Sequence, residues 1–307
     1  MSGSSTENTV KIEKSIQLTM NENNLVSYFD IKDQLRPFDL VAFRGGDLIS
    51  EMISTMEEYE IGVGAFSHVG MIVTSDILPR AKHGGKEFDL VPGHPYLFES
   101  TFTYAIAGLS DGVPDIVTGK GDFGVQLRDL EEVIPRYIKD ERCKIAWCRL
   151  KNNPFNEIPG EAKANLRRRR IILRDSFTEF FRHYEDRLYQ IDLQSLFAAM
   201  FPSLRCIRNI QDAIFTALYT VLYACGLKED NRGPAGWQFC SELVANVYKD
   251  ISIIPPEFDA KNVVPIDFFG CDVDNLPSLV EDPLYFKDWD LPKEPAIHYK
   301  EEQGQNI

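Results

Sequence analysis

The sequence is short of positive charge and has no long hydrophobic run. Its 33 lysines and arginines stand against 47 aspartates and glutamates, which gives a formal net charge of −14. A field of that sign repels phosphate backbones, so we expect no nucleic-acid partner. The longest apolar stretch, residues 213–227, falls short of the roughly 20 residues that a membrane-spanning helix needs. We expect a buried helix there, and no transmembrane helix.

Two other absences concern export and disulfides. The opening residues, "MSGSSTENTVKIEKS", lack the basic start and apolar run of a signal peptide. The 6 cysteines are scattered at no regular spacing, which is typical of reduced thiols and argues against a disulfide framework. We therefore expect a reducing, cytoplasmic compartment.

What the sequence does contain is a series of strand-like runs in its first half. Residues 37–46 ("PFDLVAFRGG"), 66–75 ("FSHVGMIVTS") and 94–102 ("HPYLFESTF") are rich in β-branched and aromatic residues and are bounded by turn formers. Two further runs, "FGVQLRDLEEVI" and "KIAWCRL", also predict strands.

The period changes to that of helices after residue 160. Within residues 161–191, apolar side chains recur at i, i+3, i+4 and i+7 and form one stripe. The stripe consists of Phe177, Phe180, Phe181, Tyr184, Leu188 and Ile191. More helix is predicted up to residue 227. After the loop "NRGPAGWQ", the segment "CSELVANVYKDI" again has helical spacing.

Cys240 begins this last helix and is a candidate nucleophile. The unpaired amides and the dipole of a helix N-terminus favour a thiolate. A thiol nucleophile also needs an imidazole and a group that orients it. His68 starts one predicted strand and Glu99 lies in the next, so they are the candidate base and acid. Gln238, with the backbone amide of Cys240, is a candidate oxyanion donor.

Each of these residues also has a purely structural interpretation. Cys240 shares a helical stripe with Leu243, Val244 and Val247, and free cysteine is among the most buried residue types. His68 alone fits a hydrogen-bonded histidine at a strand end, and Glu99 alone fits a solvated strand residue. Composition and periodicity leave both interpretations open.

A resemblance favours the catalytic interpretation. The segments "PFDLVAFR", "SHVGMIV", "LFEST", "GVQLRDLEEVI", "WCRL", "FCSELVANVYK" and "NVVPIDFF" occur in an order that resembles the circularly permuted NlpC-type, papain-like cysteine peptidases, and the YiiX-like branch in particular. The resemblance covers roughly residues 36–150 and 236–270. In that family the histidine strand comes first, the acid strand follows, and the cysteine begins a later helix.

The resemblance implies a role for three residues of this chain. The family's histidine falls on His68 of "SHVG", its acid on Glu99 of "FES", and its nucleophile on Cys240 of "FCSEL". The chain departs from the family in two ways. Phe38 stands before Asp39, where the family usually carries glycine, and residues 152–235 form a larger helical block than a minimal domain requires. Such a block would cover or reshape a substrate cleft.

Taken together, these observations predict an α+β protein with a permuted papain-like, NlpC-type fold. An antiparallel sheet or barrel would pack on the nucleophile helix, with a helical insertion. The predicted division is a flexible arm (1–30), the first part of a catalytic domain (31–150), the insertion (151–235), the second part (236–275) and an acidic tail (276–307).

The predicted function is that of a cysteine-dependent hydrolase or acyltransferase that acts on an amide, thioester or lipid ester through Cys240, His68 and Glu99. We expect no cofactor and no metal. The alternative is a catalytically silent papain-like module with a binding or structural role in a particle or complex. A third interpretation, a zinc site built on Cys143, Cys148 and a histidine, has only a lone cysteine pair behind it.

One dense basic run remains to be explained. It consists of Arg167, Arg168, Arg169 and Arg170, with Arg174 nearby. A run of like charges is most often a solvated helix face. The functional interpretation is a contact with anionic lipid headgroups or phosphate beside the apolar helices, so the expected partners are a peptide, amide or lipid acyl substrate and a membrane surface.

Overall fold

The computed structural model describes residues 22–45, 66–83, 86–101, 113–119, 124–141, 143–184, 240–270 and 277–287. The strands are β1 (Leu25–Val26), β2 (Leu40–Arg44), β3 (His68–Val73), β4 (Arg80–His83), β5 (Lys86–Asp89), β6 (Tyr96–Thr101), β7 (Gly124–Asp129), β8 (Lys144–Cys148) and β9 (Leu284–Phe286). The α-helices are α1 (Tyr28–Ile31), α4 (Leu130–Ile138), α5 (Lys163–Tyr184) and α8 (Cys240–Asp250). Short 3-10 helices cover Glu22–Asn24, Lys32–Gln34, Ala260–Asn262 and Pro265–Phe269.

Seven of the strands form one open sheet in the order β1-β9-β8-β2-β3-β6-β7, and β4 and β5 form a separate hairpin. Every neighbouring pair in the large sheet is antiparallel except β1 and β9, which run parallel. The expected α+β class with a mostly antiparallel sheet is therefore confirmed, and the sheet is open rather than closed into a barrel.

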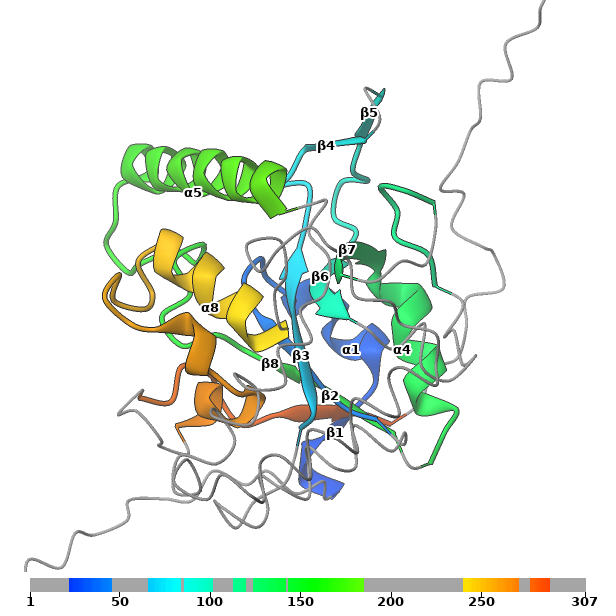
Figure 1. The fold of residues 1–307 in the computed structure, drawn as a ribbon. Helices are drawn as coiled ribbons and strands as arrows, with labels where there is room; N and C mark the ends of the chain where they lie inside the picture. Colours follow the sequence, from blue (N-terminus) through cyan, green and yellow to red (C-terminus); the bar gives the residue numbers. More distant parts are fainter. Residues whose placement is uncertain are drawn as a thin grey trace, which may run out of the picture.

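Helices cover both faces of this sheet, with α5 and α8 on one side and α1 and α4 on the other (Figure 1). The side chains of β2 follow this arrangement. Leu40 and Ala42 belong to the cluster that includes α8, whereas Val41 and Phe43 belong to the cluster that includes α4. Both faces are buried, which explains why the central strands are almost continuously hydrophobic.

The two ends of the described chain correct part of the predicted division. Leu25 and Val26 pair with Tyr285 and Phe286, so segments expected in a flexible arm and an acidic tail belong to the sheet. The physical reason is apolar burial, because Tyr28 is fully buried and packs edge-on against Phe286. Both segments are mostly polar in composition, so their few apolar residues did not predict strands.

A second correction concerns the run "FGVQLRDLEEVI", for which a strand is expected from the sequence. The strand β7 ends at Asp129 and the helix α4 begins at Leu130. The Asp129 side chain accepts a hydrogen bond from the Glu131 backbone N–H at 2.8 Å. This is the contact of a helix N-cap, and it ends the strand within the run.

The helical block is confirmed for α5 and otherwise lies outside the described residues. Phe177, Phe180 and Phe181 are buried, as their spacing predicted. They pack around Phe98 of β6, with ring centroids 5.6, 6.4 and 5.6 Å from it. Residues 185–239, which include the predicted helix at 213–227 and the loop with Gln238, are not described.

Asp39 ties the first central strand to the segment after β8. Its carboxylate accepts hydrogen bonds from the Trp147 indole N–H, the Leu150 backbone N–H and the Asn153 amide, each at 3.0 Å. Burial raises the pKa of Asp39 to about 6, although these hydrogen bonds act in the opposite direction. Asp39 therefore has a structural role in positioning β2.

Candidate active site

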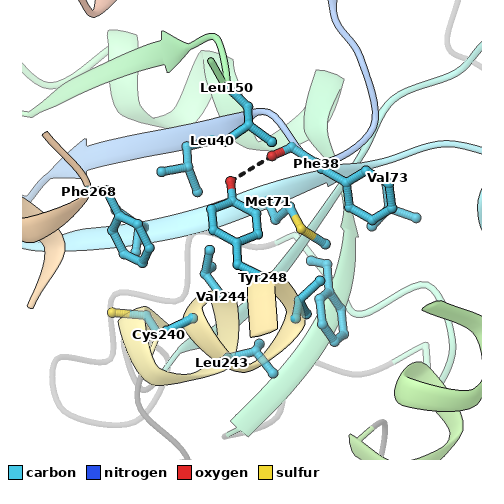
Figure 2. Close-up of a cluster of buried hydrophobic side chains, with 14 of the residues drawn as sticks. Phe38, Leu40, Met71, Val73, Leu150, Cys240, Leu243, Val244, Tyr248 and Phe268 are labelled. Atoms are coloured by element: carbon cyan, nitrogen blue, oxygen red, sulfur yellow. Dashed lines mark hydrogen bonds between the residues drawn. The ribbon is translucent and has the colours of Figure 1, made fainter. Parts of the chain in front are cut away.

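The candidate nucleophile lies at the first residue of a helix that packs on the sheet. The helix α8 buries Leu243, Val244 and Tyr248 in the main hydrophobic cluster. The Tyr248 hydroxyl donates a 2.7 Å hydrogen bond to the Phe38 carbonyl (Figure 2). Cys240 is the first residue of this helix and is 5% exposed. The apolar residues that share a helical stripe with Cys240, including Leu243 and Val244, therefore belong to the core, and their packing fixes the position of the thiol.

His68 begins the neighbouring strand β3 and holds its ring in a defined orientation. The ring packs against Phe43, with centroids 5.3 Å apart, and its side chain is 17% exposed. Nε2 lies 2.6 Å from Oε2 of Glu99. With that nitrogen engaged, Nδ1 is the ring atom left for a second partner. The Cys240 thiol is close enough to the imidazole for its charge and hydrogen bonding to act on the pKa of His68, which makes it the candidate for that second partner.

Glu99 comes from β6, the strand beside β3, and is fully buried. Its second oxygen, Oε1, accepts from Nε of Arg128 at 2.5 Å and also from Nη2 of the same guanidinium. Arg128 lies on β7 and is 2% exposed. A buried chain of charged and hydrogen-bonded groups thus runs from Arg128 through Glu99 and His68 to Cys240.

The thiol and the imidazole shift each other's pKa. Burial alone would raise the pKa of the Cys240 thiol, but the charge and the hydrogen bond of His68 outweigh it and lower that pKa. Burial alone would also lower the pKa of His68, but the charge of Cys240 and its hydrogen bond, with those of Glu99, raise it to about 10. These directions describe a thiolate beside an imidazolium.

The acid stays ionised although it is buried. Burial acts to raise the pKa of Glu99, and the charge of Arg128 together with the contacts to His68 lowers it below the ordinary value. An ionised carboxylate accepts the N–H of His68 and stabilises the ring in its charged form. The contribution of Arg128 is to hold Glu99 in that state.

Gly70 makes room for this arrangement. A Cβ at this position would lie 2.6 Å from Cδ1 of Leu97 and 3.1 Å from Cβ of Glu99. A contact of 2.6 Å does not occur between ordinary side chains and one of 3.1 Å is unusually tight, so the absence of a side chain on β3 lets β6 bring Glu99 beside His68. Gly70 is two residues from His68, on the same face of the strand.

Gln126 adds an unusual feature next to the carboxylate. It pairs with Glu99 across the β6–β7 ladder and is 3% exposed. Among the described residues, neither the oxygen nor the nitrogen of its side-chain amide finds a hydrogen-bond partner. Leaving such atoms unpaired costs about 1–3 kcal/mol for a buried group.

Three of the predicted site residues therefore converge, and others do not. Cys240, His68 and Glu99 come together from three elements that lie far apart in the sequence. The run Arg167–Arg170 lies on α5, away from these residues, and Arg167 and Arg170 line a separate groove. Gln238 lies outside the described residues.

Arg128 and Gly70 were not predicted as site residues, although both lie in segments that predict strands, "FGVQLRDLEEVI" and "FSHVGMIVTS". A charged residue that alternates with Val125 and Leu127 inside a strand, and a glycine inside an apolar strand, are the signals that were available. Neither signal identifies the residue that Arg128 or Gly70 contacts, because that residue depends on how neighbouring strands are aligned.

The described residues contain no group of three metal-binding side chains. Cys148, one of the two cysteines considered for zinc, is buried in the main cluster. Burial, helped by the charge of Asp39, raises the pKa of its thiol well above the ordinary value, which disfavours the thiolate that zinc requires. None of the described helices has both the length and the apolar character that crossing a membrane requires.

No family model matches the chain, and a search of the curated proteins finds no match. The function of the protein must therefore be inferred from the chemistry of the site.

Proposed function

We propose that this protein is a cysteine-dependent hydrolase or acyltransferase, with Cys240 as nucleophile, His68 as base and acid, and Glu99 as the residue that orients His68. The observation that carries the proposal is the buried chain from thiol to imidazole to carboxylate, in which the thiol pKa is lowered and the imidazole pKa is raised. A purely structural buried cysteine would have the opposite shift, as Cys148 does.

We further propose that the α+β fold is papain-like and circularly permuted. The order of histidine strand, acid strand and cysteine helix supports this assignment. The backbone of Phe38 supports it as well, because its φ of 71° lies in the left-handed region that favours glycine. Glycine is the residue that the resembling family usually carries at that place. In this chain the position is occupied by Phe38, whose ring is buried and packs against Phe177.

In the reaction, the Cys240 thiolate attacks a carbonyl carbon and forms a carbon–sulfur bond. The carbonyl oxygen becomes an oxyanion, which the Cys240 backbone N–H at the helix N-terminus can hold. When this intermediate collapses, the bond to the leaving nitrogen, oxygen or sulfur breaks, and imidazolium Nδ1 of His68 gives that atom its proton. The product is an acyl group on Cys240.

The second half of the reaction reverses these roles. Neutral His68 takes a proton from water, or from an acceptor hydroxyl or amine, and the resulting nucleophile attacks the acyl carbon. The carbon–sulfur bond then breaks and the thiolate–imidazolium pair is restored. Water gives a hydrolase and any other acceptor gives an acyltransferase.

The test is whether Cys240 becomes acylated. Full-length protein would be incubated with a panel of chromogenic thioesters, lipid esters and peptide amides, with intact-mass and peptide-mass analysis after rapid acid quenching. The expected result is product release with an acyl adduct on Cys240, and loss of both in Cys240→Ala. Turnover of no panel member, together with a Cys240 thiol that reacts no faster than an ordinary one, would favour the silent binding module.

A further inference from the structure

The first half of α5 has a charge opposite to that of the whole protein. The segment "KANLRRRRIILR", residues 163–174, carries six basic side chains and no acidic one. The chain as a whole has a net charge of −14. A local positive patch of this density would attract an anionic partner that the rest of the surface repels.

The outward side of this half-helix combines arginine with exposed isoleucine. Arg167 and Arg168 are exposed, and Ile171 and Ile172 are 39% and 56% exposed. Because each helical residue advances by 100°, these four side chains occupy one side of the helix. The opposite side faces the core through Leu173 and Phe177. The helix therefore has a second apolar surface, and that surface faces solvent.

A groove runs along the edge of this surface. It has a volume of about 350 Å³. Its charged lining residues are Lys163, Arg167, Arg170, Arg174, Asp76 and Glu157. Four cations thus outnumber two carboxylates, which leaves the groove positive.

Two arginines fix the walls of the groove and the preceding loop. The Arg170 guanidinium lies 4.4 Å from the centre of the Phe155 ring and donates to the Phe155 carbonyl at 3.2 Å. The neighbouring Arg169 donates to the Asn156 carbonyl in the same loop at 2.8 Å. These contacts hold the loop that carries Ile158, which is 57% exposed, against the helix.

We propose that this arginine–isoleucine surface, formed by Arg167, Arg168, Ile158, Ile171 and Ile172 with the adjacent groove, binds the surface of an anionic lipid bilayer. The helix α5 would lie along the membrane plane. Its arginines would contact lipid phosphates, and its isoleucines would enter the boundary between headgroups and acyl chains. Such a mixture of exposed cations and large apolar side chains fits a bilayer better than a nucleic acid, which offers phosphates without an apolar layer beside them.

This inference does not depend on acyl transfer at Cys240. The surface belongs to α5, and its residues take no part in the chain from Arg128 to the thiol. A Cys240→Ala variant is therefore expected to bind membranes as the wild type does, and this measurement separates the two proposals.

The experiment is co-sedimentation of the full-length protein with vesicles. One set would be made of phosphatidylcholine alone and the other of phosphatidylcholine with about one-third phosphatidylserine, in low and high salt. Arg167→Glu with Arg168→Glu removes the proposed charges. The matched control is Arg136→Glu with Lys139→Glu, which makes the same change in net charge at the C-terminal end of α4, across the sheet.

We expect salt-sensitive binding to the anionic vesicles only. The α5 double variant should weaken it at least about tenfold, given the contribution of each basic residue near a charged membrane. The α4 double variant should leave it nearly unchanged. Ile171→Ser with Ile172→Ser, which keeps the charge, should also weaken binding.

Several results would overturn the proposal. Wild-type protein that fails to sediment with anionic vesicles at low salt would do so, as would equal loss of binding in the α4 and α5 double variants. Binding that survives the isoleucine variant but is displaced by equimolar soluble polyphosphate would assign the groove to a free polyanion. Circular dichroism of each variant would establish that it is folded.

Discussion

Arg128 donates to a single oxygen of Glu99 through both Nε and Nη2, while the other oxygen of Glu99 receives His68. The two oxygens of one buried carboxylate are thus divided between a permanent cation and an imidazole that changes its charge. Because an arginine side chain does not lose its proton in proteins, it sets the ionisation of Glu99 over the whole working pH range.

The first prediction concerns the reactivity of Cys240 with pH. Limiting iodoacetamide with peptide mapping should label Cys240 at a midpoint well below about 8.5, the ordinary value for a thiol. The sign follows from the pair: His68 stays protonated as pH rises, up to about 10, so the thiolate has its counter-ion throughout that range. Activity that needs imidazolium as acid should fall as pH rises through about 10.

His68→Ala provides the control for that titration. Without the imidazolium, only burial and the weaker backbone contacts act on the thiol, and burial raises its pKa. The midpoint of Cys240 labelling should therefore move above the ordinary value. A native Cys240 that titrates like an unperturbed thiol in the wild type would contradict the proposed ion pair.

The second prediction is for Glu99→Gln. The amide keeps a hydrogen bond to His68 but loses the charge that stabilises imidazolium, so kcat/KM should fall by roughly 100- to 10,000-fold. The labelling midpoint of Cys240 should rise in the same variant. If activity is unchanged while the protein remains folded, Glu99 has no part in the reaction.

The third prediction separates the electrostatic role of Arg128 from its packing. Arg128→Met leaves Glu99 buried without its cation, and removing one partner of a buried pair costs about 3–5 kcal/mol in the free energy of unfolding. The double variant with Glu99→Gln has no uncompensated charge and should recover much of that loss. Denaturant unfolding measures both.

Activity should not recover with stability in that double variant. Its Cys240 labelling profile should resemble that of Glu99→Gln, because both lack the carboxylate beside His68. A purely structural Arg128 would instead give a destabilised single variant whose remaining folded molecules keep the wild-type pH profile.

The fourth prediction is for Gly70→Ala. The added methyl group meets Leu97 and Glu99 at distances below ordinary contact, and overpacking of this kind costs about 1–3 kcal/mol. The displaced Glu99 should also weaken its hold on His68, which raises the labelling midpoint of Cys240. Adding Leu97→Val, which removes the closest atom, should restore part of the stability. A fully stable Gly70→Ala with a wild-type labelling profile would show that β3 and β6 tolerate a side chain there.

The fifth prediction concerns the Gln126 amide, which has no hydrogen-bond partner within the part of the chain that the structure describes. Gln126→Leu replaces two buried polar atoms with apolar ones of similar volume and should raise the free energy of unfolding by about 1–3 kcal/mol. Gln34→Leu, at an exposed position, should change it by less than about 0.5 kcal/mol. A destabilised Gln126→Leu would mean that the amide has a partner in the folded protein.

The features that could be predicted from the sequence are those that depend on the composition and periodicity of a short segment. The apolar strands around His68 and Glu99, the helical stripe at Phe177 and the helix that starts at Cys240 all follow from local period and composition. The assignment of the three site residues needed a resemblance as well, since each residue alone fitted a structural role. Their spatial convergence is a property of the fold.

The features that escaped prediction depend on contacts between distant segments. Arg128 meets Glu99 only because β6 and β7 are aligned so that Leu97 is opposite Arg128. The pairing of Leu25 with Tyr285 joins segments near the two ends of the chain. The change from strand to helix at Asp129 depends on a local contact, but the capping residue lies within a run that has the composition of a strand, so the end of the strand was not predicted.

The separation of β3 from α8 along the chain also has a consequence for synthesis. On the ribosome, His68, Glu99 and Arg128 emerge long before Cys240, so the half-built sheet presents the acid and the base without the Cys240 thiol beside them. The chain therefore cannot acquire a reactive thiolate until α8 has docked, and a ribosome that stalls before residue 240 releases a fragment without the nucleophile. Closing so long a loop is also slow, and until it closes, the face of the sheet that α8 covers remains exposed to chaperones and to aggregation.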